Sequence, residues 1–173
     1  MTNKVLAKCL LGFIVLALFS CGSGEKQTLE YHLSDISLVL EGPMFPGSNE
    51  SQAEIVFSPE EVLESAGVSR DNIKNIRVKE VTLRTNNEET FDLFESIVVQ
   101  MVGGGSSLTS VAVQSPVPAS SASLTPGVSE KAELAKFKSA DKVFLVIDAN
   151  INEDYEDDFE LKADLVFLLE VSK

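Results

Sequence analysis

The chain has 173 residues, with 27 Asp and Glu against 14 Lys and Arg, a formal net charge of −13, one His, two Cys and no Trp. A chain this acidic repels phosphate backbones, which excludes most nucleic-acid-binding proteins. Both cysteines lie in the first 21 residues, so the rest of the chain has no disulfide, zinc-thiolate site or thiol nucleophile. About 150 residues is the usual size of one domain, and we therefore expect a single hydrophobic core.

The first 20 residues have the pattern of an export signal. Lys4 and Lys8 precede an uncharged, apolar stretch over residues 9–19. This stretch is too short to cross about 30 Å of hydrocarbon comfortably, and a basic segment followed by a short apolar one is typical of a signal peptide. We therefore predict a signal peptide over residues 1–20.

The end of this signal carries a recognisable motif, Leu18-Phe19-Ser20-Cys21, followed by Gly22. It resembles the lipobox of bacterial lipoproteins. The resemblance implies that a diacylglyceryl group is attached to the Cys21 thiol, that the chain is cleaved before Cys21, and that the new amino terminus is acylated. Two or more acyl chains would make the attachment to a membrane stable. The alternatives are an ordinary secretory signal or a single membrane anchor, with Cys21 incidental.

The residues after Cys21 indicate where such an anchor would hold the protein. Residues 21–27 would form a lipidated tether, and its six residues after Cys21 reach at most about 20 Å when fully extended. In this family an Asp after the lipidated Cys is the familiar inner-membrane retention signal, whereas this chain has Gly22 and Ser23. The resemblance therefore implies the outer membrane, with the leaflet left open.

The remaining residues, 28–173, are predicted to form one domain of β-strands. Alternation of apolar and polar residues, with a change of phase, predicts long bulged strands over 28–40 and 76–85. Further strands are predicted from the apolar residues of these ranges: 53–57, 91–102, 108–113, 143–151 and 159–171. The segment 91–102 is apolar on both faces, which is typical of a strand in the middle of a sheet.

Two short helices are predicted between the strands. Ser58 followed by Pro59 and then Glu61 is typical of a helix start with a capping box, and Gly67 suits the helix end. Ser129 is predicted to cap a second helix that runs through Lys138.

The last 31 residues predict a hairpin and complete the fold class. Their apolar residues fall on odd numbers on both sides of the polar segment 152–158, which predicts two antiparallel strands joined by a turn. Pairing Ile151 with Phe159 would place Asp148 opposite Lys162. With seven or eight strands, two short helices and no alternation of strand and helix, the sequence predicts an all-β, antiparallel two-sheet sandwich, immunoglobulin-like or similar.

The acidic segment 148–158 is the only candidate for a metal site. Asp148, Asn150 and Asn152 carry oxygen at alternate positions, as at the start of an EF-hand loop, but Glu153 and Phe159 replace the Gly and Glu that the loop requires. We therefore expect no metal ligand here. An Asp148–Lys162 ion pair and a solvated turn explain the charges, with calcium binding as the alternative.

The predicted hairpin would also carry an apolar half-face made of Phe144, Val146, Val166 and Leu168. Such a half-face must be covered. Residues 129–140, with Leu134 and Phe137, or the other sheet are expected to cover it, and the alternative is a groove for a partner.

No catalytic residue can be singled out. His32 is the only imidazole and is expected at the surface, and Gly103–Gly105 lacks the Lys of a phosphate-binding loop. We therefore predict a membrane-anchored lipoprotein of the cell envelope that is not an enzyme and holds no cofactor. It would bind a protein, glycan or lipid component, or act as an accessory subunit. The alternative is a calcium-dependent adhesion or carbohydrate-binding module.

Overall fold

The structure, a computed structural model, describes residues 26–86, 89–140 and 142–173. The predicted signal peptide and Cys21 lie outside these residues. The strands are β1 Lys26–Leu40, β2 Gly47–Ile55, β3 Ile73–Thr85, β4 Phe94–Gly103, β5 Thr109–Gln114, β6 Ser123–Leu124, β7 Gly127–Val128, β8 Val143–Ile151 and β9 Phe159–Ser172. The helical elements are α1 Glu60–Ser65 and three 3₁₀ turns, Arg70–Asn72, Phe91–Leu93 and Ala135–Ser139. β1 begins at Lys26, so the last two residues of the predicted tether belong to a strand.

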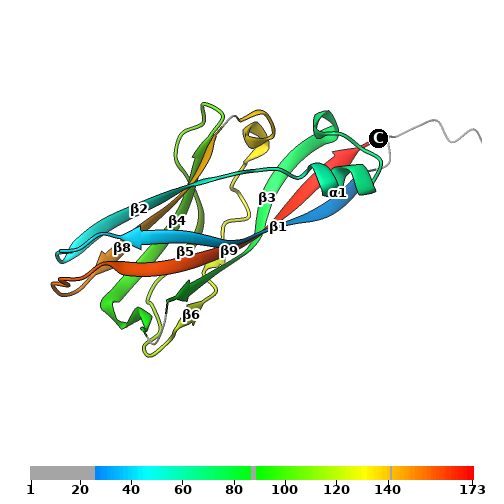
Figure 1. The fold of residues 1–173 in the computed structure, drawn as a ribbon. Coiled ribbons are helices and arrows are strands. Elements are labelled where there is room, and N and C mark those ends of the chain that lie inside the picture. The colour runs from blue at the N-terminus through cyan, green and yellow to red at the C-terminus, as the bar shows by residue number, and fades with distance from the viewer. Residues whose placement is uncertain (1–25, 87–88, 141) are drawn as a thin grey trace, which may run out of the picture.

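The strands form two antiparallel sheets that face one another (Figure 1). The four-stranded sheet has the order β1-β9-β3-β6, and the five-stranded sheet has the order β2-β8-β4-β5-β7. β1 and β2 belong to different sheets, as do β8 and β9, and the first strand pairs with the last. This is the arrangement of a jelly roll. The predicted two-sheet β-sandwich is confirmed, in the jelly-roll form instead of the immunoglobulin form.

The core lies between the sheets and contains the residues that the alternation predicted. Every odd-numbered residue of β9 from Phe159 to Val171 is buried, and the even-numbered ones face outward. Two aromatic groups belong to this core. Tyr31, Phe57 and Phe167 form one. Phe91, Phe94, Tyr155 and Phe159 form the other.

The predicted hairpin of β8 and β9 is wrong. β8 pairs with β2 and β4, while β9 pairs with β1 and β3, so residues 152–158 carry the chain from one sheet to the other. Asp148 lies opposite Glu50 and Val98, not opposite Lys162. The period-2 pattern shows which side chains face the core, but a hairpin and a crossover bury the same residues, so the pattern could not distinguish them.

The predicted apolar half-face is absent for the same reason. Phe144 and Val146 lie on the outer face of the five-stranded sheet, whereas Val166 and Leu168 lie on the outer face of the other sheet. Val146 is buried, and the other three are half-buried. The four side chains therefore form neither a common groove nor a surface that residues 129–140 could cover.

The helical predictions are confirmed only in part. α1 ends just before Gly67, whose φ of +67° suits a helix end. The predicted capping box is wrong, because the Ser58 hydroxyl donates to the Glu60 carboxylate, at 2.8 Å, and the helix begins at Glu60. The predicted helix over 129–138 is reduced to the 3₁₀ turn Ala135–Ser139. No helix in the described ranges is long and apolar enough to cross a membrane.

Candidate functional site

Four loops meet at one end of the sandwich. β1 pairs antiparallel with β9, with Lys26 opposite Ser172, so both strands have their outer ends at what we call the terminal end. The opposite end collects the segments that join β1 to β2, β3 to β4, β5 to β6 and β8 to β9 (Figure 1). We call this the four-loop end and define it by residues 41–46, 86–93, 115–122 and 152–158, of which 87 and 88 are not described.

Hydrogen bonds tie these loops together. The backbone N–H of Met44 donates to the carbonyl of Tyr155 at 2.8 Å, and the N–H of Tyr155 donates back at 3.0 Å. The N–H of Gly42 donates to the Asp158 carboxylate at 2.9 Å. The Asp92 carboxylate accepts the backbone N–H of Ser120, which joins the other two loops. The four-loop end is therefore a connected surface, with the arrangement of loops on a rigid scaffold that is common in binding proteins.

The four-loop end is strongly acidic. Its described residues include no Lys or Arg, and they include these acids: Glu41, Glu89, Asp92, Glu153, Asp154, Glu156, Asp157 and Asp158. Hydrogen bonds from the Ser120 N–H and from the Thr90 hydroxyl lower the pKa of Asp92. Burial and the nearby Glu89 carboxylate raise the pKa of the Tyr155 hydroxyl. Both shifts favour an ionised Asp92 and a neutral Tyr155 at this surface.

Asp148 and Asn150, two of the candidate calcium residues, form hydrogen bonds to different partners. Asp148 accepts a hydrogen bond from the Ser48 hydroxyl at 2.6 Å, and the Asn150 amide donates to the Glu95 carboxylate at 2.7 Å. The described ranges contain no group of three or more His, Cys, Asp or Glu side chains placed to hold a metal ion. Lys162, the predicted partner of Asp148, is 3.5 Å from the Asp35 carboxylate.

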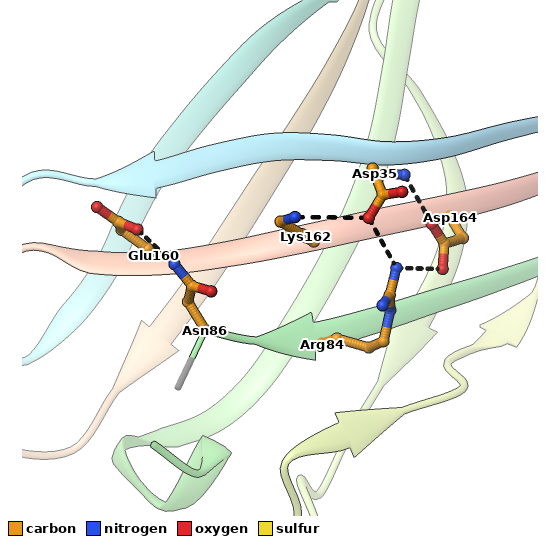
Figure 2. A network of polar contacts seen from close by, with 6 residues as sticks. All are labelled: Asp35, Arg84, Asn86, Glu160, Lys162 and Asp164. Atoms are coloured by element: carbon orange, nitrogen blue, oxygen red, sulfur yellow. Dashed lines mark hydrogen bonds and ion pairs between the residues drawn. The ribbon is translucent and has the colours of Figure 1, made fainter. Parts of the chain in front are cut away.

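A polar network crosses the outer face of the four-stranded sheet near the four-loop end (Figure 2). Asp35 of β1 forms ion pairs with Arg84 of β3, at 3.3 Å, and with Lys162 of β9, at 3.5 Å. The Asp164 carboxylate of β9 accepts two hydrogen bonds, one from the Arg84 guanidinium at 2.8 Å and one from the backbone N–H of Asp35 at 2.8 Å. Asn86 donates to Glu160 at 2.7 Å. The network joins three strands across the predicted bulge of β1, where the register shifts between Leu33 and Ile36.

Asp35 has a positive φ of 59°, which Asp and Asn tolerate better than β-branched residues do. Asp35→Asn should therefore lower the free energy of unfolding by at most about 1 kcal/mol, the usual upper value for surface ion pairs. Asp35→Val should lower it by about 2 kcal/mol, because it adds backbone strain to the same loss. Urea unfolding of both variants tests this, and equal losses would contradict a left-handed residue at this bulge.

A depression of about 290 Å³ lies between β1 and β2. It is lined by Val39, Leu40, Glu41, Met44, Asn49, Glu50, Ser51 and Gln52. We call it the β1–β2 notch. The sequence pattern did not indicate the notch. Residues 39–41 and 49–52 lie side by side only because the chain passes from one sheet to the other between β1 and β2. The Ser51 hydroxyl accepts a hydrogen bond from the Val39 N–H at 3.1 Å. This bond joins β1 to β2 and separates the notch from the core.

The residues considered for catalysis remain separate. His32 is exposed on β1, with its Nε2 atom 3.8 Å from the Glu30 carboxylate. Gly103–Gly105 forms the turn after β4, where the Ser106 hydroxyl donates to the Gly103 carbonyl. Two features of the described residues could hold a ligand, the four-loop end and the β1–β2 notch beside it.

Comparisons with known proteins add the following findings. No model of a known protein family matches the chain, and no curated protein matches it. Three virus structures match it over nearly the whole length of both chains. They are Cocksfoot mottle virus (11% identity, covering 100% of this chain and 97% of that one, TM-score 0.26), Desmodium yellow mottle tymovirus (9%, 100% and 97%, 0.32) and a virus-like particle of Macrobrachium rosenbergii nodavirus (13%, 99% and 96%, 0.30). Likeness at these TM-scores supports no statement about function.

Proposed function

We propose that this chain is a lipid-anchored protein of the cell envelope whose jelly-roll domain acts as a non-catalytic binding or accessory module. The anchor in this proposal is Cys21, within the motif that resembles a lipobox. The position at which β1 begins is the structural observation that supports this proposal. β1 begins at Lys26, only five residues after Cys21, and it begins at the terminal end, opposite the four-loop end.

The short connection would hold the terminal end close to the membrane. Five residue steps span at most about 18 Å, and the tether therefore leaves the domain little freedom to move away. β1 itself has 15 residues, and at about 3.3 Å per residue it extends for roughly 45 Å. The four-loop end would thus face away from the bilayer, where a partner could reach it.

The charge distribution supports the same orientation. The described loops of the four-loop end have no basic residue, whereas the terminal end carries charges of both signs, with Lys26, Lys74, Lys136 and Lys142 as well as Glu60, Glu61, Glu64 and Asp71. An anionic lipid surface repels the acidic four-loop end more strongly than it repels the terminal end.

The anchor is tested by Cys21→Ser in the organism that makes the protein. The native protein should sediment with membranes and be released only by detergent, whereas Cys21→Ser should appear in the soluble fraction. Cys9→Ser is the matched control, because Cys9 lies inside the apolar stretch, and this variant should remain with the membranes.

Two further measurements complete this test. Mass spectrometry of the native protein should show a chain that begins at an acylated Cys21, and density-gradient fractions should place it with the outer membrane. A Cys21→Ser chain that stays membrane-bound, or a native chain with an unmodified thiol at position 21, would contradict the proposal.

A further inference from the structure

We infer that a pocket at the terminal end binds the phosphate group of an anionic membrane lipid between Lys26 and Lys74. The inference rests on the proposed membrane anchor and names a lipid that the anchored domain contacts. The pocket has a volume of about 520 Å³, which is within the usual range of small-molecule sites. It is lined by residues 26–28 of β1, Lys74 of β3 and residues 170–172 of β9, and we call it the terminal pocket.

The strand order places the two lysines on either side of β9. β9 lies between β1 and β3 in the four-stranded sheet. Lys26 is opposite Ser172, and Lys74 lies in the register shift of β3 opposite residues 170 and 171. Neighbouring strands are about 4.8 Å apart, so the backbones of the two lysines lie roughly 10 Å apart. Their long side chains can therefore meet at one anion above β9, where the hydroxyls of Ser172 and Thr28 supply two more donors.

The terminal pocket carries a local positive charge in an acidic protein. Among the described residues that line it, Glu170 is the only acid, and Arg77 neutralises it in an ion pair. Neither Lys26 nor Lys74 forms an ion pair with another described residue. The three glutamates of α1 do not line the pocket. An anion that enters it is therefore attracted by two ammonium groups that have no competing partner there.

The position of the terminal pocket favours a lipid headgroup as this anion. Lys26 lines the pocket and is five residue steps from Cys21, which span at most about 18 Å. Phosphates are the negatively charged groups of phospholipid headgroups at a membrane surface. The anchor would hold the pocket beside these groups at a high effective concentration, so two lysines and two hydroxyls are enough to bind one of them.

An acidic segment of a protein partner fits the terminal pocket less well. Stable protein interfaces depend on a few apolar or aromatic side chains that fill pockets at their centre. The exposed or half-buried side chains that line this pocket are all polar, and its one apolar residue, Val171, is buried in the core. A lipid headgroup needs no apolar contact here, because its acyl chains stay in the bilayer.

The test measures the acetylation of individual lysines by mass spectrometry in the full chain, held in micelles of an uncharged detergent. Dihexanoyl phosphatidylglycerol should slow the acetylation of Lys26 and Lys74 about fivefold, because both ammonium groups contact its phosphate. Dihexanoyl phosphatidylcholine, whose choline cancels the charge, should leave both rates nearly unchanged. Inorganic phosphate at the same concentration should do the same, because it is not concentrated at the micelle. Lys136, an exposed lysine of the same end that does not line the pocket, is the internal control.

Two variants show whether the lysines share one ligand. Lys26→Gln should remove the protection of Lys74, whereas Lys136→Gln, which changes the charge equally, should keep it. Both should melt within about 2 °C of the native chain, since surface substitutions have small effects. The inference would be overturned by no protection, by equal protection of Lys136, or by protection of Lys74 that survives Lys26→Gln. Protection by phosphatidylcholine or inorganic phosphate as strong as that by phosphatidylglycerol would also overturn it.

The Cys21→Ser chain distinguishes this inference from the proposed anchor. Its terminal pocket is unchanged and the probe lipid comes from the micelle, so Lys26 and Lys74 should be protected as in the native chain. A failure of the anchor would therefore appear in the membrane fractionation, and a failure of the terminal pocket in the acetylation rates.

Discussion

Phe167→Ala is expected to lower the free energy of unfolding by about 4 kcal/mol. Phe167 has no exposed surface and lies at the centre of β9, which pairs with strands on both sides. Its ring is 5.5 Å from that of Phe57 and 6.1 Å from that of Tyr31, so alanine removes one of three rings that pack together. Replacing a buried Phe by Ala typically costs about 3–5 kcal/mol, because the lost burial is accompanied by a cavity.

The loss should appear as a decrease in Tm of roughly 10 °C for a domain of this size. Phe167→Leu keeps most of the volume and should lose only about 1–2 kcal/mol. Phe45→Ala removes the same number of atoms from a ring that is 63% exposed, and it should change stability by at most about 0.5 kcal/mol. Similar losses for Phe167→Ala and Phe45→Ala would show that Phe167 is not enclosed by both sheets.

The core could be predicted from the sequence because burial follows the pleat of the strands. In β9 the alternation holds for all of its buried residues, from Phe159 to Val171, without a break. Two of the bulges could also be predicted, because they shift a long alternation by one position, at Ser34 and Asp35 in β1 and at Lys79 in β3. The register shifts at Ile73–Asn75 and within β4 were not predicted. Both signals are local, and both depend only on which side of the sheet a residue faces.

The partners of the strands could not be predicted in the same way. β8 and β9 are consecutive and alternate in phase, which suits a hairpin, yet they lie in opposite sheets. What separates them is the attachment of the connecting segment: Tyr155 pairs with Met44, and Asp158 accepts from Gly42, more than 100 residues earlier in the chain. Contacts of such long sequence separation leave no periodic trace in the sequence.

The helix start was misjudged for a related reason. Ser58 and Glu61 have the spacing of a capping box, but the Ser58 N–H donates to the Tyr31 hydroxyl, at 3.1 Å, and the Ser58 hydroxyl donates to Glu60. A buried tyrosine of another strand therefore competes with the local cap.

Gly42→Ala is expected to lower the free energy of unfolding by about 3 kcal/mol. A methyl group at Gly42 would lie 2.6 Å from the carbonyl oxygens of both Glu156 and Asp157, and neither of these backbone atoms can rotate away as a side chain could. The loops would have to separate, which would also weaken the bond from the Gly42 N–H to Asp158. Forcing extra atoms into a close-packed contact typically costs about 1–3 kcal/mol, and the lost hydrogen bond places this variant at the upper end.

Two other glycines separate this steric effect from the general effects of adding a side chain. Gly127→Ala places its methyl group 3.6 Å from the Val113 carbonyl, an ordinary contact, and should change stability by at most about 0.5 kcal/mol. Gly105→Ala meets no atom within 4 Å but has a φ of +69°, so it should lose about 1 kcal/mol through backbone strain alone. Urea unfolding of the three variants should therefore rank Gly42 well above Gly105, and Gly105 above Gly127. If Gly42→Ala lost no more than Gly105→Ala, the loops that meet at Gly42 would be able to move apart at little cost, and the four-loop end would not be the rigid surface that its hydrogen bonds indicate.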